Sequence, residues 1–68
     1  MIEIEKTQNC ISKIESLINT LKNHLKLYEK YEKNKEFIKQ IHNADKSTAI
    51  TIKYYIKEII LILDNFDL

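Results

Sequence analysis

The feature of this sequence that most constrains its fold is an absence: its 68 residues include neither glycine nor proline. These are the residues that tight turns most often need, and glycine also forms the loops that hold phosphate groups in many proteins. Long helices joined by few, polar connections are what remains. We therefore expect an all-α fold, and the chain length allows one domain, residues 1–68.

The most apolar part of the chain is the segment 49–66. Its apolar residues recur at spacings of three and four, which places them on one face of a helix: Ala49, Ile52, Ile56, Ile59, Leu63 and Phe66. Ile60 widens this face, whereas Leu61 and Ile62 fall outside it, so the run 59–63 is apolar almost all round. Such a helix needs neighbours on more than one side.

The N-terminal part is expected to form one long helix, from Met1 to about His42. Its apolar stripe has coiled-coil spacing and consists of Ile4, Ile11, Ile14, Ile18, Leu21, Leu25 and Tyr28. The stripe weakens at Asn34, a mild helix breaker, and at Lys35, which takes the place of an apolar residue. We expect the helix to continue through Asn34. The alternative is a break near Asn34 and a three-helix bundle.

The polar segment 43–48 is the expected connection to a second, shorter helix. Asp45, Ser47 and Thr48 can each cap a helix N-terminus by accepting from its free N–H groups. The second helix is then expected from about Thr48 to Asn65. It would fold back on the first helix as an antiparallel helical hairpin.

The expected helices differ in length, about 60 Å for the first and about 27 Å for the second. A hairpin of this kind leaves part of the first helix without cover, namely Ile4, Ile11, Ile14, Leu17, Ile18 and Leu21. Soluble monomers rarely expose so large an apolar patch. We therefore expect these six residues to mediate self-association or partner binding, and the chain to form a homodimer, as a four-helix bundle or coiled coil.

Groups that could carry chemistry are few. Cys10, His24 and His42 are the only thiol and imidazole groups, and a helix would separate the first two by about 21 Å. No pair has zinc-finger spacing, and the carboxylates lack the Glu and His pattern of di-iron bundles. A single cysteine also excludes a disulfide within the chain. We expect no catalytic residue, metal site or cofactor.

A basic ridge is the main polar feature of the first helix, and it consists of Lys22, Lys26, Lys30 and Lys33. The segment 22–42 holds six lysines and three glutamates, although the whole chain has a net charge of only +1. The ridge could contact a partner protein or the phosphates of a nucleic acid. Interleaved glutamates and the lack of arginine favour a solvated helix face instead.

The N-terminus lacks the order of a signal peptide, and the longest apolar run is far too short to span a bilayer. We expect a cytoplasmic protein without membrane insertion. Abundant Ile, Lys and Asn indicate an AT-rich genome, such as that of a low-GC bacterium, its phage or some archaea. The expected function is a non-enzymatic protein-interaction module, a small regulator, inhibitor or adaptor; a nucleic-acid-binding accessory protein is the alternative.

Overall fold

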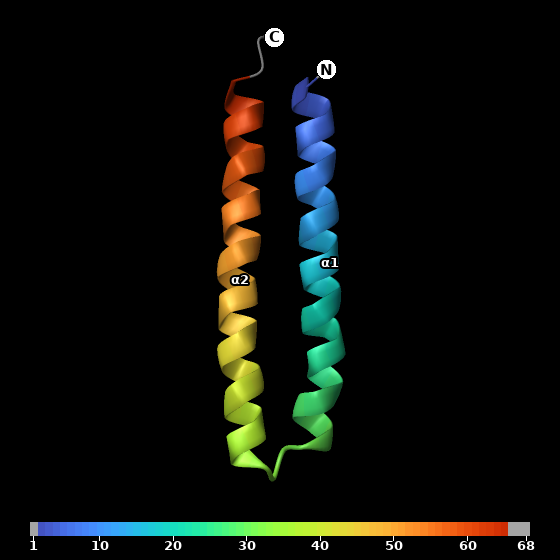
Figure 1. Cartoon of the computed structure of the whole chain (residues 1–68), viewed down its shortest axis with the longest axis vertical. Coiled ribbons are helices and arrows are strands. Elements are labelled where there is room, and N and C mark those ends of the chain that lie inside the picture. Colours follow the sequence, from blue (N-terminus) through green and yellow to red (C-terminus); the bar gives the residue numbers. More distant parts are fainter. Residues whose placement is uncertain (1, 66–68) are drawn as a thin grey trace.

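In a computed structural model the chain forms two antiparallel helices joined by a short turn (Figure 1). Helix α1 spans Ile2–Lys30 and α2 spans Lys35–Asp64, and the structure describes residues 2–65. The helices lie side by side along a hairpin 53 Å long, with both termini at the same end. The predicted all-helical hairpin is confirmed. Phe66, predicted to end the apolar stripe, lies outside the described residues.

The turn lies at a different place from the predicted one. Residues 31–34 join the helices, and the predicted connection at 43–48 lies inside α2. Helix α1 has 29 residues and α2 has 30, so the expected long first helix and short second helix are wrong. The alternative placed the break near Asn34 correctly, but two helices, not three, make up the described part of the chain.

Asn34 stabilises the start of α2. Its side-chain Oδ1 accepts a hydrogen bond from the Phe37 N–H at 3.2 Å, which satisfies one of the free donors of the first helical turn. The Asn34 N–H donates to the Tyr31 carbonyl at 2.9 Å. The Tyr31 and Phe37 rings pack edge to face, 4.8 Å between centroids. No residue from 2 to 65 has a positive φ angle, so this turn requires no glycine.

The segment 43–48 stays helical because its polar side chains find partners within and across the helices. The Thr48 hydroxyl donates to the Ala44 carbonyl at 3.0 Å, and the Thr51 hydroxyl donates to the Ser47 carbonyl at 3.0 Å. Asp45 reaches across to α1. Residues that often cap helices are tolerated inside one when their polar groups are satisfied in this way.

The helices meet along one seam, in which the contacting residues come in pairs three positions apart. The pairs follow one another at four-residue steps, the spacing of a coiled coil. On the N-terminal side the seam is Thr7, Cys10, Ile14, Leu17, Leu21, His24 and Tyr28 of α1 with Tyr31 of the turn, and on α2 it is Ile38, Ile41, Asp45, Thr48, Ile52, Tyr55, Ile59 and Ile62. Among the described residues only Cys10, Ile41 and Ile62 are buried, and each keeps 6% to 8% of its surface exposed. One neighbouring helix covers each seam residue from one direction, so most of the seam is half-buried.

Candidate functional site

One long side of the hairpin carries apolar side chains beside the seam. The residue that precedes each seam pair lies on the opposite long side of the hairpin. Lys6 is an example, and its Nζ lies 3.8 Å from the Glu58 carboxylate of α2. Antiparallel packing likewise brings together the residues that follow each pair, such as Ile11 and Ile56. We call this side the apolar flank: Ile4, Ile11, Ile18 and Leu25 of α1 with Ala49, Ile56 and Leu63 of α2.

The six residues predicted to bind a partner are divided between the apolar flank and the seam. Ile4, Ile11 and Ile18 lie on the flank and are 43% to 53% exposed. The other three lie in the seam, half-buried against α2: Ile14, Leu17 and Leu21. Because α2 covers α1 along its length, the mismatch that motivated the expected dimer does not exist. The open flank is a separate reason to expect a partner.

Four flank residues were not among the predicted site residues: the small Ala49 and three large residues, Leu25, Ile56 and Leu63. The three large residues are 65%, 45% and 55% exposed, at least as open as Ile11. The sequence carries a signal for them, because Ile4, Ile11, Ile18 and Leu25 repeat at intervals of seven beside the seam. The same interval separates Ala49, Ile56 and Leu63.

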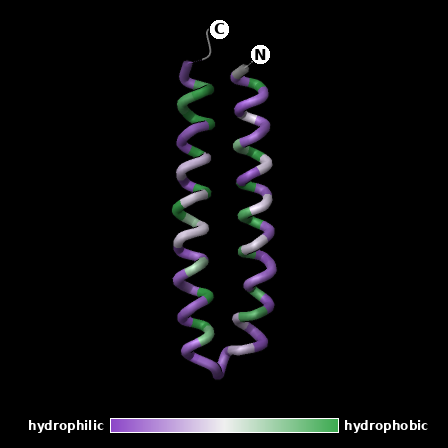
Figure 2. The backbone as a smooth tube through the Cα atoms, in the orientation of Figure 1, coloured by the Kyte–Doolittle hydropathy of each residue, from purple (hydrophilic) through white to green (hydrophobic). Residues whose placement is uncertain are grey.

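The C-terminal part of α2 is apolar on more sides than α1 can cover. Hydrophobic stretches gather in this part of α2, whereas the turn between the helices is mostly hydrophilic (Figure 2). Ile62 is buried in the seam, but Ile60, Leu61 and Leu63 are 51% to 55% exposed. The sequence predicted that this run needs neighbours on more than one side, and the hairpin supplies one.

A polar cluster interrupts the apolar seam nearer to the turn than to the open end of the hairpin. The Nδ1 of His24 lies 2.6 Å from Asp45 Oδ1, and the Tyr28 hydroxyl donates to Asp45 Oδ2 at 2.9 Å. An ionised carboxylate only accepts, so His24 Nδ1 carries the proton of this bond. The Asp45 side chain is 15% exposed and that of His24 is 25% exposed. The cluster therefore crosses the interface between the helices in a half-buried position.

The electrostatics of the cluster stabilise the charged form of Asp45. Partial burial raises the pKa of Asp45, but hydrogen bonds from His24 and Tyr28 and the nearby imidazoles of His24 and His42 outweigh it, and the pKa lies below its ordinary value. The pKa of Tyr28 is raised, first by loss of contact with water and then by its hydrogen bond to the Asp45 carboxylate and the negative charge there. Asp45 is the acceptor that holds the two α1 side chains.

This cluster fixes which residues of the two helices lie opposite each other. Sequence reasoning treated Asp45 as a helix cap and did not pair it with His24, whereas both side chains are partly buried in the seam. The missed signal is that Asp45 stands at a seam spacing, between Ile41 and Thr48. Polar residues at such positions specify register in coiled coils. Any one-turn slip of α2 would separate Asp45 from both donors.

The structure shows no further grouping with the geometry of a catalytic or metal site. Cys10 is buried in the seam, two seam pairs away from His24. His42 is exposed in the N-terminal third of α2, not near the end of the first helix as expected. Within residues 2–65, no three His, Cys, Asp or Glu side chains lie close enough together to hold a metal ion.

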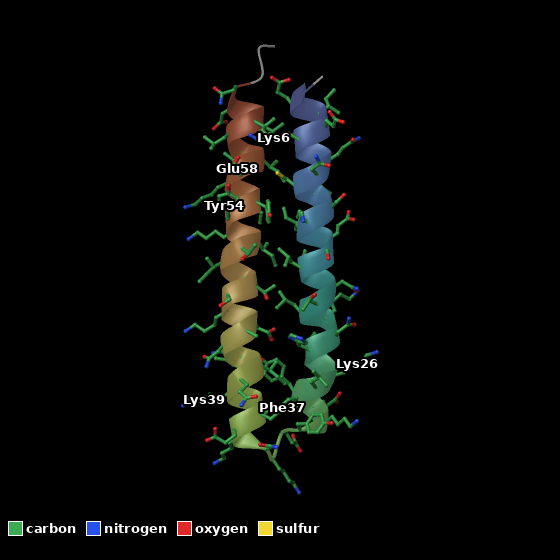
Figure 3. The ribbon with its side chains drawn as sticks, in the orientation of Figure 1. Lys6, Lys26, Phe37, Lys39, Tyr54 and Glu58 are labelled. Atoms are coloured by element: carbon green, nitrogen blue, oxygen red, sulfur yellow. The ribbon has the colours of Figure 1, made fainter. Side chains whose placement is uncertain are left out.

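The predicted basic ridge is exposed along its whole length. Lys22, Lys26 and Lys30 lie on α1 and Lys33 lies in the turn. Lys26 points away from the space between the helices, as Lys39 does on α2 (Figure 3). Within the described residues, Lys30 is the one of these four lysines whose side-chain charge has a partner. Its Nζ lies 5.4 Å from the centre of the Tyr31 ring.

Neutralising the basic ridge is expected to leave the fold intact. Exposed helix charges contribute a few tenths of a kcal/mol per pair. The triple change Lys22→Gln, Lys26→Gln and Lys30→Gln should therefore move the thermal midpoint, followed by circular dichroism, by only a few degrees. A large drop would show that these side chains are packed or paired.

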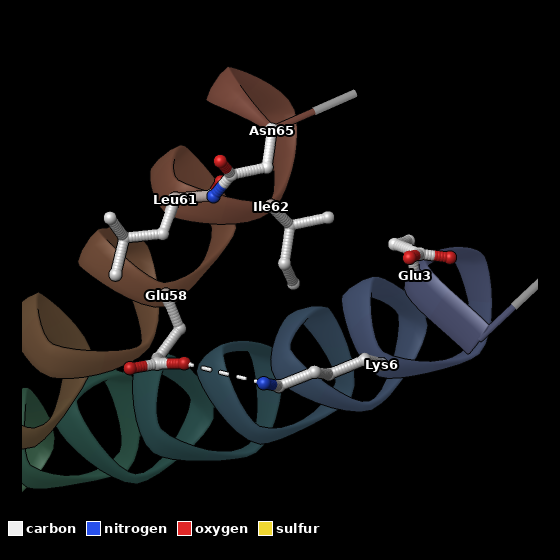
Figure 4. A pocket seen from close by; sticks show the side chains of 6 residues that line it. All are labelled: Glu3, Lys6, Glu58, Leu61, Ile62 and Asn65. Carbon is white, nitrogen blue, oxygen red and sulfur yellow. Dashed lines mark hydrogen bonds and ion pairs between the residues drawn. The ribbon is translucent and has the colours of Figure 1, made fainter. Parts of the chain in front are cut away.

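A shallow pocket lies at the open end of the hairpin, on the side opposite the apolar flank (Figure 4). Its residues are Glu3, Lys6, Glu58, Leu61, Ile62 and Asn65. The ion pair between Lys6 and Glu58 crosses its floor. A second shallow groove runs along the outer side of α2 and is lined by Ile50, Lys53, Tyr54 and Lys57. The first pocket already pairs its charges, and the second lies on a single helix.

In comparisons with known proteins, no family model, curated protein or solved structure matches this chain. None of the helices in the described region is long and apolar enough to cross a membrane. Arguments about function therefore rest on the surfaces of the hairpin. The apolar flank is the most extended of these surfaces.

Proposed function

We propose that this chain is a non-enzymatic protein-interaction module, a small regulator, inhibitor or adaptor that acts by docking its apolar flank on another protein surface. The observation that supports the proposal is the position of the large aliphatic residues. They repeat along both helices on one side of the hairpin, and Ile4 and Leu25 are more than half exposed. Extended exposed apolar patches on soluble proteins mark interaction sites.

The small core gives a second reason for a partner. A chain of 68 residues that exposes this much isoleucine and leucine has a marginal core, and small domains often gain stability through association. Helix faces with aliphatic anchors at regular spacing bind hydrophobic grooves and other helices. We propose that the isolated protein is a homodimer and that the same surface serves for binding in the cell.

The flank can be tested by a double substitution on α1, Ile11→Glu and Ile18→Glu. Both side chains are 43% exposed, so the change should leave the hairpin helical while it places charge on the docking surface. Affinity purification from the native host, with tagged protein, should recover a stoichiometric partner with the wild type and lose it with this variant. The loss should be at least tenfold, because a buried aliphatic side chain contributes about 1.5–3 kcal/mol.

The matched control is Ile50→Glu with Leu61→Glu, on the outer side of α2. These residues are 68% and 54% exposed, so the control adds the same charge to equally open aliphatic positions. It should retain the partner. Equal recovery with all three proteins would refute a role of the apolar flank, and salt-dependent retention of both variants on DNA would favour the basic ridge and nucleic-acid binding instead.

A further inference from the structure

We propose that the apolar flank is covered by a second copy of this chain, with α1 of each copy packed on α2 of the other and both turns at the same end. The result is a four-helix bundle in which every helix is antiparallel to its neighbours. This inference rests on the proposed function, since it names the partner of the same surface.

The size of the flank fits a dimer interface. The hairpin measures 53 by 15 by 13 Å, so one long side offers an area of about 800 Å². Stable protein interfaces of standard size bury about 800 Å² per partner. Contact over the whole of this side, the flank together with the residues beside it, would therefore have the area that a specific dimer needs. A second exposed apolar patch, around Ile50 and Tyr54, lies on one helix and is interrupted by Lys53 and Lys57.

At one level of the flank, a large residue faces a small one across the proposed interface. His24 lies level with Asp45, so Ile18, six residues earlier, lies near the height of Ala49 and Thr51 on α2. In the proposed dimer the large Ile18 of one copy meets the small Ala49 of its partner. Alternation of large and small residues across facing helices allows close packing.

The charges that border the flank decide how the second copy is oriented. On α2 the charged residues of the border are all basic, namely Lys39, Lys46 and Lys53, and Ile60 follows them at the same spacing. If the turns lay at opposite ends, the α2 border of one copy would face the α2 border of the other. Lys46 of each copy would then lie against Lys53 of its partner. With both turns at the same end, the α2 border faces the α1 border of the partner, which contains two glutamates. Exposed pairs of opposite charge contribute little affinity. Contact between like charges, however, disfavours the orientation with the turns at opposite ends.

The heights of these charges match in the proposed orientation. Glu15 lies nine residues before His24, and Lys53 lies eight residues after Asp45, so the two lie at nearly the same level. Glu29 and Lys39 also lie at nearly the same level along the hairpin, between the polar cluster and the turn. Each glutamate therefore faces a lysine of the partner. Lys22 opposite Lys46 is the one unfavourable contact of this orientation.

Sedimentation equilibrium tests the dimer, and distances between spin labels test its orientation. The purified wild type should have twice the chain mass of 8.1 kDa at tens of micromolar. For the distance, a nitroxide is attached to Lys33→Cys in the turn, in a Cys10→Ala background. Labels at the same end should lie within about 25 Å, since neighbouring helices are 8–10 Å apart. Opposite ends would separate them by nearly the 53 Å length of the hairpin.

Charge reversal provides a second readout that does not depend on the labels. Lys53→Glu should raise the dimer dissociation constant several-fold in the proposed orientation, and adding Glu15→Lys should restore it. In the opposite orientation Lys53→Glu alone would tighten the dimer, because it would face Lys46. Glu5→Lys, on the outer side of α1 and off the border, is the matched control for Glu15→Lys.

A monomer mass with a helical spectrum, or labels near 50 Å apart, would overturn this inference. The proposed function fails on a different result, namely equal partner recovery by the wild type and the Ile11→Glu, Ile18→Glu variant. A dimer with close labels, weakened by Lys53→Glu and restored by Glu15→Lys, is the expected outcome.

Discussion

Replacing Ile14 and Leu21 together with Asp is expected to unfold the chain, and not only to separate it from a partner. Both residues lie in the seam, half-buried against α2. Burial of each is worth about 1.5–3 kcal/mol, and two such losses are comparable with the stability of a small domain, about 5 kcal/mol at the low end. The far-ultraviolet spectrum of the variant should lose most of its helical signal at room temperature.

The matched control changes two residues of the same helix that lie beside the seam. Ile11→Asp with Ile18→Asp places the same charges on the apolar flank, where the side chains are already open to water. This control should stay helical. If both variants unfolded alike, the hairpin would depend on association for its stability. If the seam variant stayed folded, the helices would pack through a different face.

The contrast between these variants shows where sequence reasoning was limited. Two apolar stripes run along α1 with the same seven-residue period, one through Ile14 and Leu21 and the other through Ile11 and Ile18. They merge into one broad apolar face, which periodicity alone identifies correctly as helical. Periodicity does not say which part of a broad face meets the neighbouring helix, because that depends on the partner and its register.

The place of the turn was misjudged for a related reason. Local propensity favoured a connection at Asp45, Ser47 and Thr48, which are good capping residues. These residues lie inside a helix because of contacts with residues far away in the sequence. Asp45 accepts hydrogen bonds from His24 and Tyr28. Asn34 carried the correct local signal, weakened by the absence of any glycine beside it. Tertiary contacts overrode propensity at the first site and agreed with it at the second.

The same polar cluster links the fold to the open flank. A seam of aliphatic residues alone would allow α2 to slide by one turn with little loss, whereas Asp45 has both donors in one register only. That register sets which flank residues lie side by side. Moving α2 by one turn would shift Ile56 and Leu63 relative to Ile11 and Ile4. The polar cluster therefore maintains the shape of the apolar flank, although it contributes no residue to it.

Asp45→Asn is expected to lower the stability of the hairpin near neutral pH and to reduce its sensitivity to acid. An asparagine amide offers one acceptor and one donor group, so it cannot accept from both His24 and Tyr28 as the two carboxylate oxygens do. In a domain of this size each 1 kcal/mol lost lowers the thermal midpoint by about 4–8 °C. Thermal unfolding near neutral pH, followed by circular dichroism, measures the change.

The acid dependence follows from the direction of the pKa shift. The pKa of Asp45 is lowered in the folded chain, so its contribution is complete above the unfolded value of about 3.9 and is lost as the pH falls through the folded value. Below about pH 4 the thermal midpoint of the wild type should therefore fall. Asp45→Asn already lacks the charge, so its midpoint should not show this fall. Glu32→Gln, an exposed carboxylate of the turn, should leave the acid profile of the wild type unchanged. Parallel profiles for the wild type and Asp45→Asn would show that the carboxylate does not hold the two helices in register.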